Sequence, residues 1–164
     1  MTYGKYGQEN GVLLVDLYGG PAYRIRRAHQ IATAVFAQAC EELGLTHSQY
    51  AVLFALRQCG PVGQNELGRL VSLDRCTTSV VVGILSERGL TSRMEFPNDR
   101  RKVLLRLTTP GQRILARAER RSSSASTALL SVFSKNQARA FMDLLDKFNR
   151  AHDRQVLEPL RSRI

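Results

Sequence analysis

The sequence predicts a mainly α-helical protein that carries one small β-hairpin. Apolar residues recur at helical spacing through most of the chain, and one pair of short strand-like segments surrounds a polar turn. The length of 164 residues is sufficient for a single domain with a hydrophobic core, and 43% of the residues are apolar. This composition is typical of a folded globular protein rather than of a disordered or collagen-like chain.

The chain carries a large surplus of positive charge. It contains 24 Lys and Arg residues against 14 Asp and Glu residues, a formal net charge of +10 at pH 7. This surplus favours nucleic acid as partner ahead of an anionic membrane surface, and the alternative is a basic protein with neither. No segment approaches the roughly 18 continuous apolar residues of a membrane helix, and residues 1–10 lack a secretory signal. We therefore expect a cytoplasmic protein without membrane contact.

The residues that most often bind metals or perform chemistry are scattered. The cysteines and histidines are Cys40, Cys59, Cys76, His29, His47 and His152. Their spacing matches neither a disulfide framework nor a structural zinc site. The sequence also lacks paired carboxylates, a Gly-rich phosphate loop and a nucleophile–base pattern. We therefore expect a protein that is not an enzyme and that has no cofactor.

The first elements are an arm and a long helix. Residues 1–20 predict an irregular N-terminal arm, which Gly19-Gly20 ends before Pro21 opens a helix. Apolar side chains at helical spacing over residues 22–42 predict the first helix, and Gly44 is expected to close it.

A second helix is predicted over residues 50–58. Thr46 and Gln49 have the spacing of a capping box in front of it, because the threonine can accept from first-turn amides while the glutamine reaches back. Gly60-Pro61 marks the end of this helix.

Two short helices follow, over residues 65–71 and 75–88. A three-residue turn joins them, and Asp74 is well suited to cap the second helix. This is the spacing of a helix-turn-helix, with an inward face expected to consist of Thr78, Val81, Val82 and Leu85. Taken alone, the pattern fits an ordinary pair of apolar helices equally well.

A basic hairpin comes directly after this pair of helices. Residues 91–96 and 102–107 predict two strands around a polar turn. From residue 88 to residue 106 there are six basic residues against two acidic ones. A helix-turn-helix followed by a basic hairpin is a winged helix, which favours DNA binding over chemistry.

Two long helices complete the chain. Thr109 is expected to cap the first of them with Pro110 at its first position, and the helix to run to about residue 133. Ser134 and Gln137 predict a second capping box, which opens a last helix whose apolar stripe includes Val156 and Leu157. These stripes exceed what a small winged helix needs, so we expect them to form a dimer interface together with the first helix and the arm.

The expected organisation is one continuous domain with three parts. They are an arm at residues 1–20, dimerisation helices at 21–45 and 110–164, and a winged helix-turn-helix DNA-binding region at 46–109.

At this point the chain resembles the multiple antibiotic resistance regulator (MarR) family of dimeric winged-helix transcription factors, over about residues 22–160. The most specific parts are LDRCTTS at 73–79, LSERGL at 85–90, and DRR, five residues, LT, two residues and G at 99–111. The resemblance implies a homodimer that binds a double-stranded pseudo-palindromic operator, with half-sites about 10 bp apart. Repression is favoured over activation, because a small dimer acts most simply by occupying a promoter.

The second helix of the helix-turn-helix is expected to read bases in the major groove. Arg75 can reach guanine O6 and N7 or a phosphate, and Val80 can meet a thymine methyl group. Thr77 and Ser79 can reach base edges or phosphates. The alternative for these two hydroxyls is that they only satisfy amides at the start of the helix.

The hairpin is expected to contact the minor groove and the phosphates. The resemblance implies that Arg101 enters the minor groove while Asp99 orients the loop, and a guanidinium suits the negative potential of a narrow A·T-rich groove. Arg93, Arg100 and Lys102 are expected at phosphates. The alternative is a solvated cluster of charges.

The resemblance implies an effector site between the DNA-binding region and the dimerisation helices. The run RRAHQI at 26–31 is similar to the branch of the family that responds to aromatic acids or their thioesters. We expect an aromatic carboxylate that releases the protein from DNA. Its expected contacts are Arg26, Arg27, His29, Gln30, Tyr23, Phe36 and Tyr50, with His29 on the inward stripe of the helix. Alternatively, His29 is a satisfied core histidine and the arginines face solvent or form intersubunit ion pairs.

Two other functions of the same fold remain open. Cys76 lies near a helix N-terminus beside Arg75, and both features lower the pKa of a thiol, so a redox-responsive repressor is one alternative. A DNA-bridging or architectural protein without ligand control is the other. Release from a defined operator by a ligand would separate it from the ligand-controlled regulator.

Overall fold

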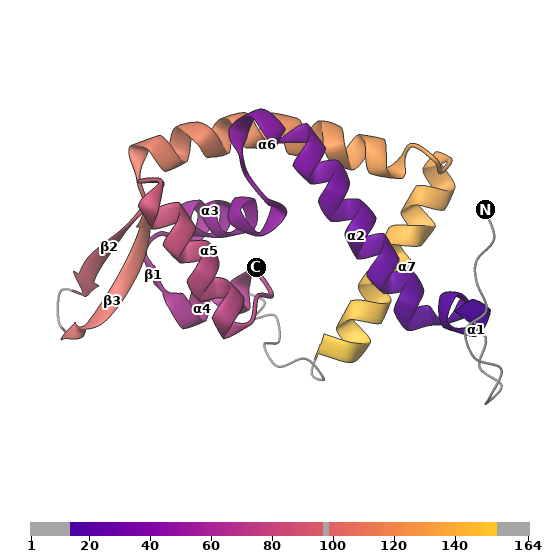
Figure 1. The fold of residues 1–164 in the computed structure, drawn as a ribbon, viewed down its shortest axis with the longest axis horizontal. Helices are drawn as coiled ribbons and strands as arrows, with labels where there is room; N and C mark the ends of the chain where they lie inside the picture. The colour runs from indigo at the N-terminus through magenta and orange to yellow at the C-terminus, as the bar shows by residue number, and fades with distance from the viewer. Residues whose placement is uncertain (1–13, 97–98, 154–164) are drawn as a thin grey trace.

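In the computed structural model the described residues are 14–96 and 99–153, with residues 14–16, 96 and 99–102 described by their backbone alone. The elements along the chain are α1 (Leu14–Gly19), α2 (Pro21–Ala39), the 3-10 turn η1 (Glu41–Leu43), α3 (His47–Cys59), β1 (Val62–Gly63), α4 (Gln64–Leu70), α5 (Arg75–Glu87), β2 (Thr91–Phe96), β3 (Asp99–Leu107), α6 (Thr109–Leu130) and α7 (Lys135–His152) (Figure 1). The mainly helical class with a small hairpin wing is confirmed.

The elements form two lobes that the long helix α6 joins (Figure 1). The sheet lobe consists of α3, α4, α5 and the strands, and the helical lobe consists of α1, α2 and α7. The sheet is antiparallel with the strand order β1-β3-β2, and Leu105 on β3 lies between Val62 on β1 and Arg93 on β2. None of the helices in the described part of the chain is long and apolar enough to cross a membrane.

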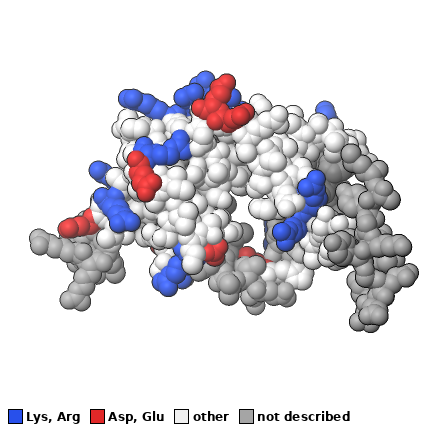
Figure 2. Space-filling view, in the orientation of Figure 1, with Lys and Arg blue, Asp and Glu red and all other residues white. Residues whose placement is uncertain are grey.

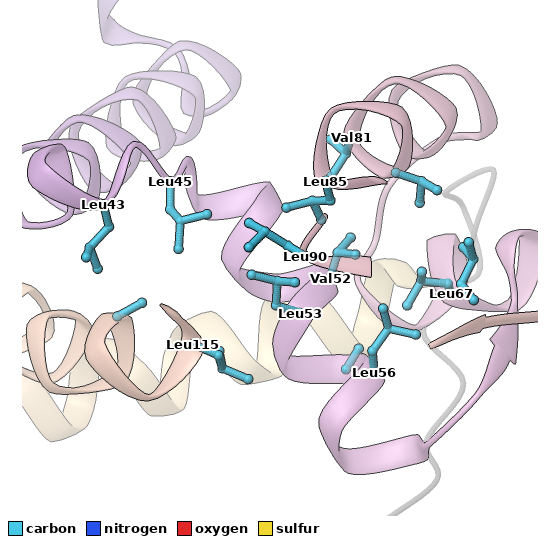
Figure 3. Close-up of a cluster of buried hydrophobic side chains, with 14 of the residues drawn as sticks. Leu43, Leu45, Val52, Leu53, Leu56, Leu67, Val81, Leu85, Leu90 and Leu115 are labelled. Atoms are coloured by element: carbon cyan, nitrogen blue, oxygen red, sulfur yellow. The ribbon is translucent and has the colours of Figure 1, made fainter. Parts of the chain in front are cut away.

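Helix α3 lies at the centre of the hydrophobic core (Figure 3). Its side chains Val52, Leu53 and Leu56 are fully buried, in one cluster with Leu85 from α5 and Leu115 from α6. A single core therefore fixes α5 and α6 against the same helix.

The predicted inward face of α5 is confirmed. Thr78, Val81, Val82 and Leu85 are all buried. The Thr78 hydroxyl donates to the carbonyl oxygen of Asp74 at 2.7 Å, so the polar group on this face is satisfied within the helix.

Three predicted helix caps are confirmed. Capping boxes are present at Thr46 with Gln49 and at Ser134 with Gln137, and Asp74 accepts from the amide of Thr77. These caps depend on residues three positions apart, which is why a local pattern predicts them.

The start of α6 differs from the prediction by one residue. The cap is Thr108, not Thr109, and Pro110 occupies the second helical position. The Thr108 hydroxyl accepts from the amide of Gly111 at 3.1 Å and donates to the Gly89 carbonyl oxygen at 2.7 Å. This second bond, to the end of α5, favours Thr108 over its neighbour.

Other boundaries also need correction. Part of the arm, residues 14–19, is helical rather than irregular, and residues 1–13 lie outside the described part of the chain. Helix α2 ends at Ala39, and Gly44, with φ of 55°, closes the short turn η1 instead.

Strand β3 begins at Asp99, because Asp99 pairs with Phe96 across the hairpin. The two-residue strand β1 was not predicted because it is too short to show alternation. Val156 and Leu157 lie outside the described residues.

Two glycines allow close approach between elements. A Cβ atom at Gly68 on α4 would lie 2.6 Å from Thr78 Oγ1 on α5, so the absent side chain lets these two helices cross. A Cβ atom at Gly111 would overlap the carbonyl oxygen of Leu90 and lie 2.7 Å from Leu107 Cδ1. The backbone at Leu90, just after α5, therefore approaches the start of α6 directly, and the side chain of Leu107 at the end of β3 packs beside it.

The substitution Gly111→Ala is expected to lower the free energy of unfolding by about 1–3 kcal/mol, because the added methyl group must displace Leu90 or Leu107. Gly83→Ala is the matched control. A Cβ atom at Gly83 meets nothing within 4 Å, so alanine is expected to raise the stability of α5 by up to about 1 kcal/mol. Urea denaturation followed by circular dichroism measures both values, and effects of the same sign and size would contradict the close approach at Gly111.

Candidate nucleic-acid interface

The outward face of α5 is exposed and partly apolar. Val80 is 62% exposed and Ile84 is 37% exposed, and the polar residues Arg75, Cys76 and Ser79 are also exposed. Large apolar side chains on a solvated helix face that also carries polar groups favour a surface that inserts into a partner. Four residues predicted to contact DNA, Arg75, Thr77, Ser79 and Val80, therefore come together on this one helix.

Asp74 organises the first turn of α5. Its Oδ1 accepts from the Thr77 amide at 2.9 Å and its Oδ2 accepts from the Thr77 hydroxyl at 2.6 Å. These two bonds from Thr77 hold the pKa of the Asp74 carboxyl below its usual range. Asp74 therefore caps the helix, and the Thr77 hydroxyl is not needed to satisfy the amides at the helix start.

Asn65 is a residue that the sequence reasoning missed. It lies on the first turn of α4, and its Oδ1 accepts from Arg75 Nε at 3.4 Å. Because only Nε makes this bond, the two terminal nitrogens of the Arg75 guanidinium remain available to a further partner. Asn65 reaches Arg75 because α4 is only 7 residues long, so its first turn lies close to the start of α5.

The hairpin projects from the sheet lobe beside α5 (Figure 1). Arg93 is exposed on β2, and Arg106 Nε donates to Ser92 Oγ at 2.9 Å across the two strands. Asp99, Arg100, Arg101 and Lys102 lie at the start of β3, and their side chains lie outside the described part of the chain. On the face in Figure 2, basic side chains are more prominent than acidic ones over the sheet lobe and over α2.

A second feature is an open groove of about 530 Å³ between α2 and the start of α3. Its lining consists of Gln30, Thr33, Ala34, Ala37, Thr46, His47 and Ser48. Figure 2 shows a hollow between α2 and the sheet lobe. The lining is small and mostly uncharged, which suits a small molecule with a flat apolar body and a few polar groups.

An aromatic cluster lies next to this groove. The buried Phe36 ring lies 5.2 Å from the His47 ring and 5.2 Å from the Tyr50 ring, measured between centroids. Burial, together with the nearby charge of His29, lowers the pKa of His47, so this imidazole is neutral at pH 7. Of the residues predicted to contact the effector, Gln30 lines this groove, His29 and Phe36 lie near His47, and Tyr50 lies against Phe36. The sequence reasoning did not select His47.

The other three predicted effector residues, Tyr23, Arg26 and Arg27, do not line the groove. Tyr23 packs on Tyr18 with a ring distance of 4.9 Å, and it is 13 positions, about 20 Å of helix, from Phe36. It cannot line the same site within one chain. Arg26 and Arg27 are exposed, and Arg27 Nη1 donates to Gln30 Oε1 at 3.4 Å.

The placement of His29 on the inward stripe of α2 was wrong, because this residue is exposed in the single chain. The side chain of α2 that is buried against α3 is Phe36. The missed residue, His47, occupies the first position of α3, one turn from Tyr50. The aromatic spacing of residues 47, 50 and 54 was the available signal.

One contact joins the groove region to α5. The guanidinium of Arg88, at the end of α5, donates to the carbonyl oxygens of Gly44 at 2.6 Å and Leu43 at 2.9 Å. These carbonyls belong to the segment that leads into Thr46 and His47. This bidentate contact therefore connects the segment before the groove wall to the C-terminal end of α5.

The three cysteines are free. Cys76 is exposed on α5 and Cys59 is exposed at the end of α3, whereas Cys40 is buried and its burial raises the pKa of its thiol. Within the described residues, no group of three or more His, Cys, Asp or Glu side chains could hold a metal ion.

Known transcriptional regulators are similar to this chain. The family model described as the MarR family matches residues 45–103. The transcriptional repressor NicR of Pseudomonas putida is 38% identical over 91 residues, which cover 56% of this chain. The match spans 58% of the length of NicR, less than two thirds.

Two solved structures extend the likeness over nearly the whole of their chains. The PcaV transcriptional regulator of Streptomyces coelicolor, in complex with its natural ligand, is 30% identical with a TM-score of 0.73. The match covers 87% of this chain and 99% of PcaV. BpsR of Bordetella bronchiseptica, whose DNA binding is regulated by 6-hydroxynicotinic acid, is 26% identical with a TM-score of 0.75, and the match covers 89% and 98% of the two chains. The chain belongs to the MarR family and is a DNA-binding transcriptional regulator.

Proposed function

We propose that this regulator is a homodimeric repressor that binds a pseudo-palindromic operator and is released by a small aromatic carboxylate. The observation that carries the DNA-binding part is the outward face of α5, where exposed Val80 and Ile84 adjoin Arg75, Thr77 and Ser79. A face of this composition suits the major groove, where apolar side chains meet thymine methyl groups and polar ones meet base edges. NicR is named a repressor, which supports the sign of regulation.

The wing contributes the remaining DNA contacts in this proposal. Arg93 and the basic residues Arg100 and Lys102 neutralise phosphates, and Arg101 enters the minor groove with Asp99 orienting the turn. Such contacts release counterions, so the affinity falls steeply with salt concentration.

A second copy of the chain covers the apolar surface of the helical lobe. No described residue of α7 is buried, although this helix and its approach carry large apolar side chains. They are Val132, Phe133, Phe141, Met142, Leu144, Leu145 and Phe148, and α1 and α2 add Leu17, Tyr18, Ile25 and Ile31. A patch of this extent on a soluble protein marks a protein–protein contact. Two-fold pairing through it places two α5 helices about one DNA turn apart.

The groove between α2 and α3 is the proposed effector site. Neutral His47 and Gln30 provide polar contacts beside the ring of Phe36, and Arg27, which bonds to Gln30, provides a cation for a carboxylate. Arg26, His29 and Tyr50 lie close along the same elements. BpsR responds to 6-hydroxynicotinic acid, an aromatic carboxylate, which supports this class of ligand. Release of the protein from DNA then proceeds through Arg88, which bonds the segment that leads into the groove to the end of α5.

The substitution Arg75→Ala is expected to weaken binding to an operator duplex about 10- to 100-fold, because a guanidinium that reads guanine or a phosphate contributes about 1–3 kcal/mol. Arg117→Ala is the matched control, since Arg117 is exposed on α6 outside the proposed interface. Fluorescence anisotropy at several salt concentrations measures both affinities. Equal affinities for the two variants, or an affinity that is insensitive to salt, would overturn the proposed interface.

The substitution Leu144→Glu is expected to convert the dimer into a monomer, because it places a charge in the centre of the proposed apolar contact. Leu144 is 67% exposed in the single chain, so the change should not disturb the core. Multi-angle light scattering gives the mass, and Ala116→Glu on exposed α6 serves as control. If the wild-type chain has the mass of one 18.4 kDa polypeptide, the dimer proposal is wrong.

A hydroxylated aromatic acid at 100 times its dissociation constant is expected to raise the melting temperature by about 5–10 °C. A thermal-shift screen with 6-hydroxynicotinate, hydroxybenzoates and cinnamates measures this. His47→Ala should abolish the shift, whereas Tyr23→Phe should retain it because Tyr23 lies at the far end of α2. Silence with every acid would remove the effector class, and loss of the shift in the Tyr23 variant alone would place the site elsewhere.

A further inference from the structure

The first turn of α5 fixes the position of one hydroxyl proton. A threonine hydroxyl has one proton to donate and two lone pairs that can accept. At Thr77, the hydroxyl lies 2.6 Å from Asp74 Oδ2 while the Thr77 amide lies 2.9 Å from Asp74 Oδ1. Both oxygens of one carboxyl group are therefore occupied by the same residue.

The direction of this hydrogen bond follows from the charge of Asp74. The bonds from Thr77 hold the pKa of Asp74 below its ordinary value, so the group is a carboxylate at neutral pH. An ionised carboxylate has no proton and only accepts. The proton of the Thr77 hydroxyl is therefore committed to Asp74, and only lone pairs remain for any other partner.

We propose that Thr77 determines specificity by reading DNA only as a hydrogen-bond acceptor, so that it selects an exocyclic amino group in the major groove. In that groove the donors on base edges are N6 of adenine and N4 of cytosine, whereas guanine and thymine present acceptors at N7, O6 and O4. The proposal rests on the proposed role of α5 as the reading helix. Asp74 is the positioning residue, since it acts through Thr77.

The neighbours of Thr77 allow it to reach a base edge. Arg75 and Val80 on the same helix are exposed, and Val80 lies three positions after Thr77, on the adjacent turn of the same face. Thr77 itself is half-buried, because Asp74 lies against its hydroxyl. An amino group approaching Thr77 therefore meets an oxygen whose proton points away.

Base analogues test the polarity with the intact wild-type protein. The full-length chain first selects a high-affinity duplex from random sequence, and each half-site base is then replaced singly. Purine for adenine and pyrimidin-2-one for cytosine delete an amino group, whereas 7-deazapurines and 4-thiothymine delete or weaken an acceptor. We expect one position at which deletion of the amino group weakens binding about fivefold. Thr77→Ser, which keeps the hydroxyl, should retain that sensitivity, and Thr77→Val should lose it.

The substitution Asp74→Asn gives a sharper test of the positioning residue. Asparagine caps helices as well as aspartate does, so α5 is expected to remain folded. The amide oxygen then accepts from the Thr77 amide, and the amide nitrogen donates to the Thr77 hydroxyl, which frees its proton. At the Thr77 position the variant should therefore lose sensitivity to amino-group deletion and become sensitive to loss of an acceptor. A purely structural role of Asp74 predicts no such change in preference.

The outcomes separate this proposal from the proposed function. If no duplex is selected at all, the reading role of α5 fails. If a duplex is selected but the position that depends on Thr77 responds to loss of an acceptor, the assigned polarity is wrong. If no base position depends on Thr77, the residue does not read a base and the proposal is likewise overturned.

Discussion

The packing of α3 is the constraint on which the rest of the molecule depends. Its buried face lies in one cluster with Leu85 of α5 and Leu115 of α6 (Figure 3). α5 carries the proposed reading surface, and α6 leads to the apolar surface of α7. Because one core holds α5 and α6, close packing sets the orientation of the proposed reading surface relative to the helix that leads to α7. Interiors of this density pass displacements on instead of absorbing them.

Polar contacts at the two ends of α5 complete this arrangement. At the first turn, Asp74 and Asn65 orient Thr77 and Arg75. At the other end, Arg88 holds the carbonyls of Leu43 and Gly44, which precede the groove wall. Side-chain contacts thus fix both ends of α5, and the contact at its C-terminal end is made with the segment next to the site proposed for the effector.

The sequence predicts the parts of the fold that depend on local patterns. Capping boxes, the Asp74 cap, the inward face of α5 and the hairpin were all predicted, because each is encoded by residues a few positions apart. The predictions fail where a contact with a residue distant in the sequence determines the structure. Thr108 is the cap because it also bonds to Gly89, and His47 joins the groove only because α2 folds back beside α3. Helical spacing indicates which face of a helix a residue occupies, but it does not indicate how far a binding site extends along that face. For this reason the sequence analysis grouped Tyr23 with Phe36.

The most direct test of the account is a hydroxyl-radical footprint of the full-length protein on a duplex that it selects. The central claim is that two chains hold two α5 helices on one side of the duplex. The account predicts two equivalent protected segments, related by a two-fold axis and about 10 bp apart from centre to centre. A single protected segment without two-fold symmetry would contradict it.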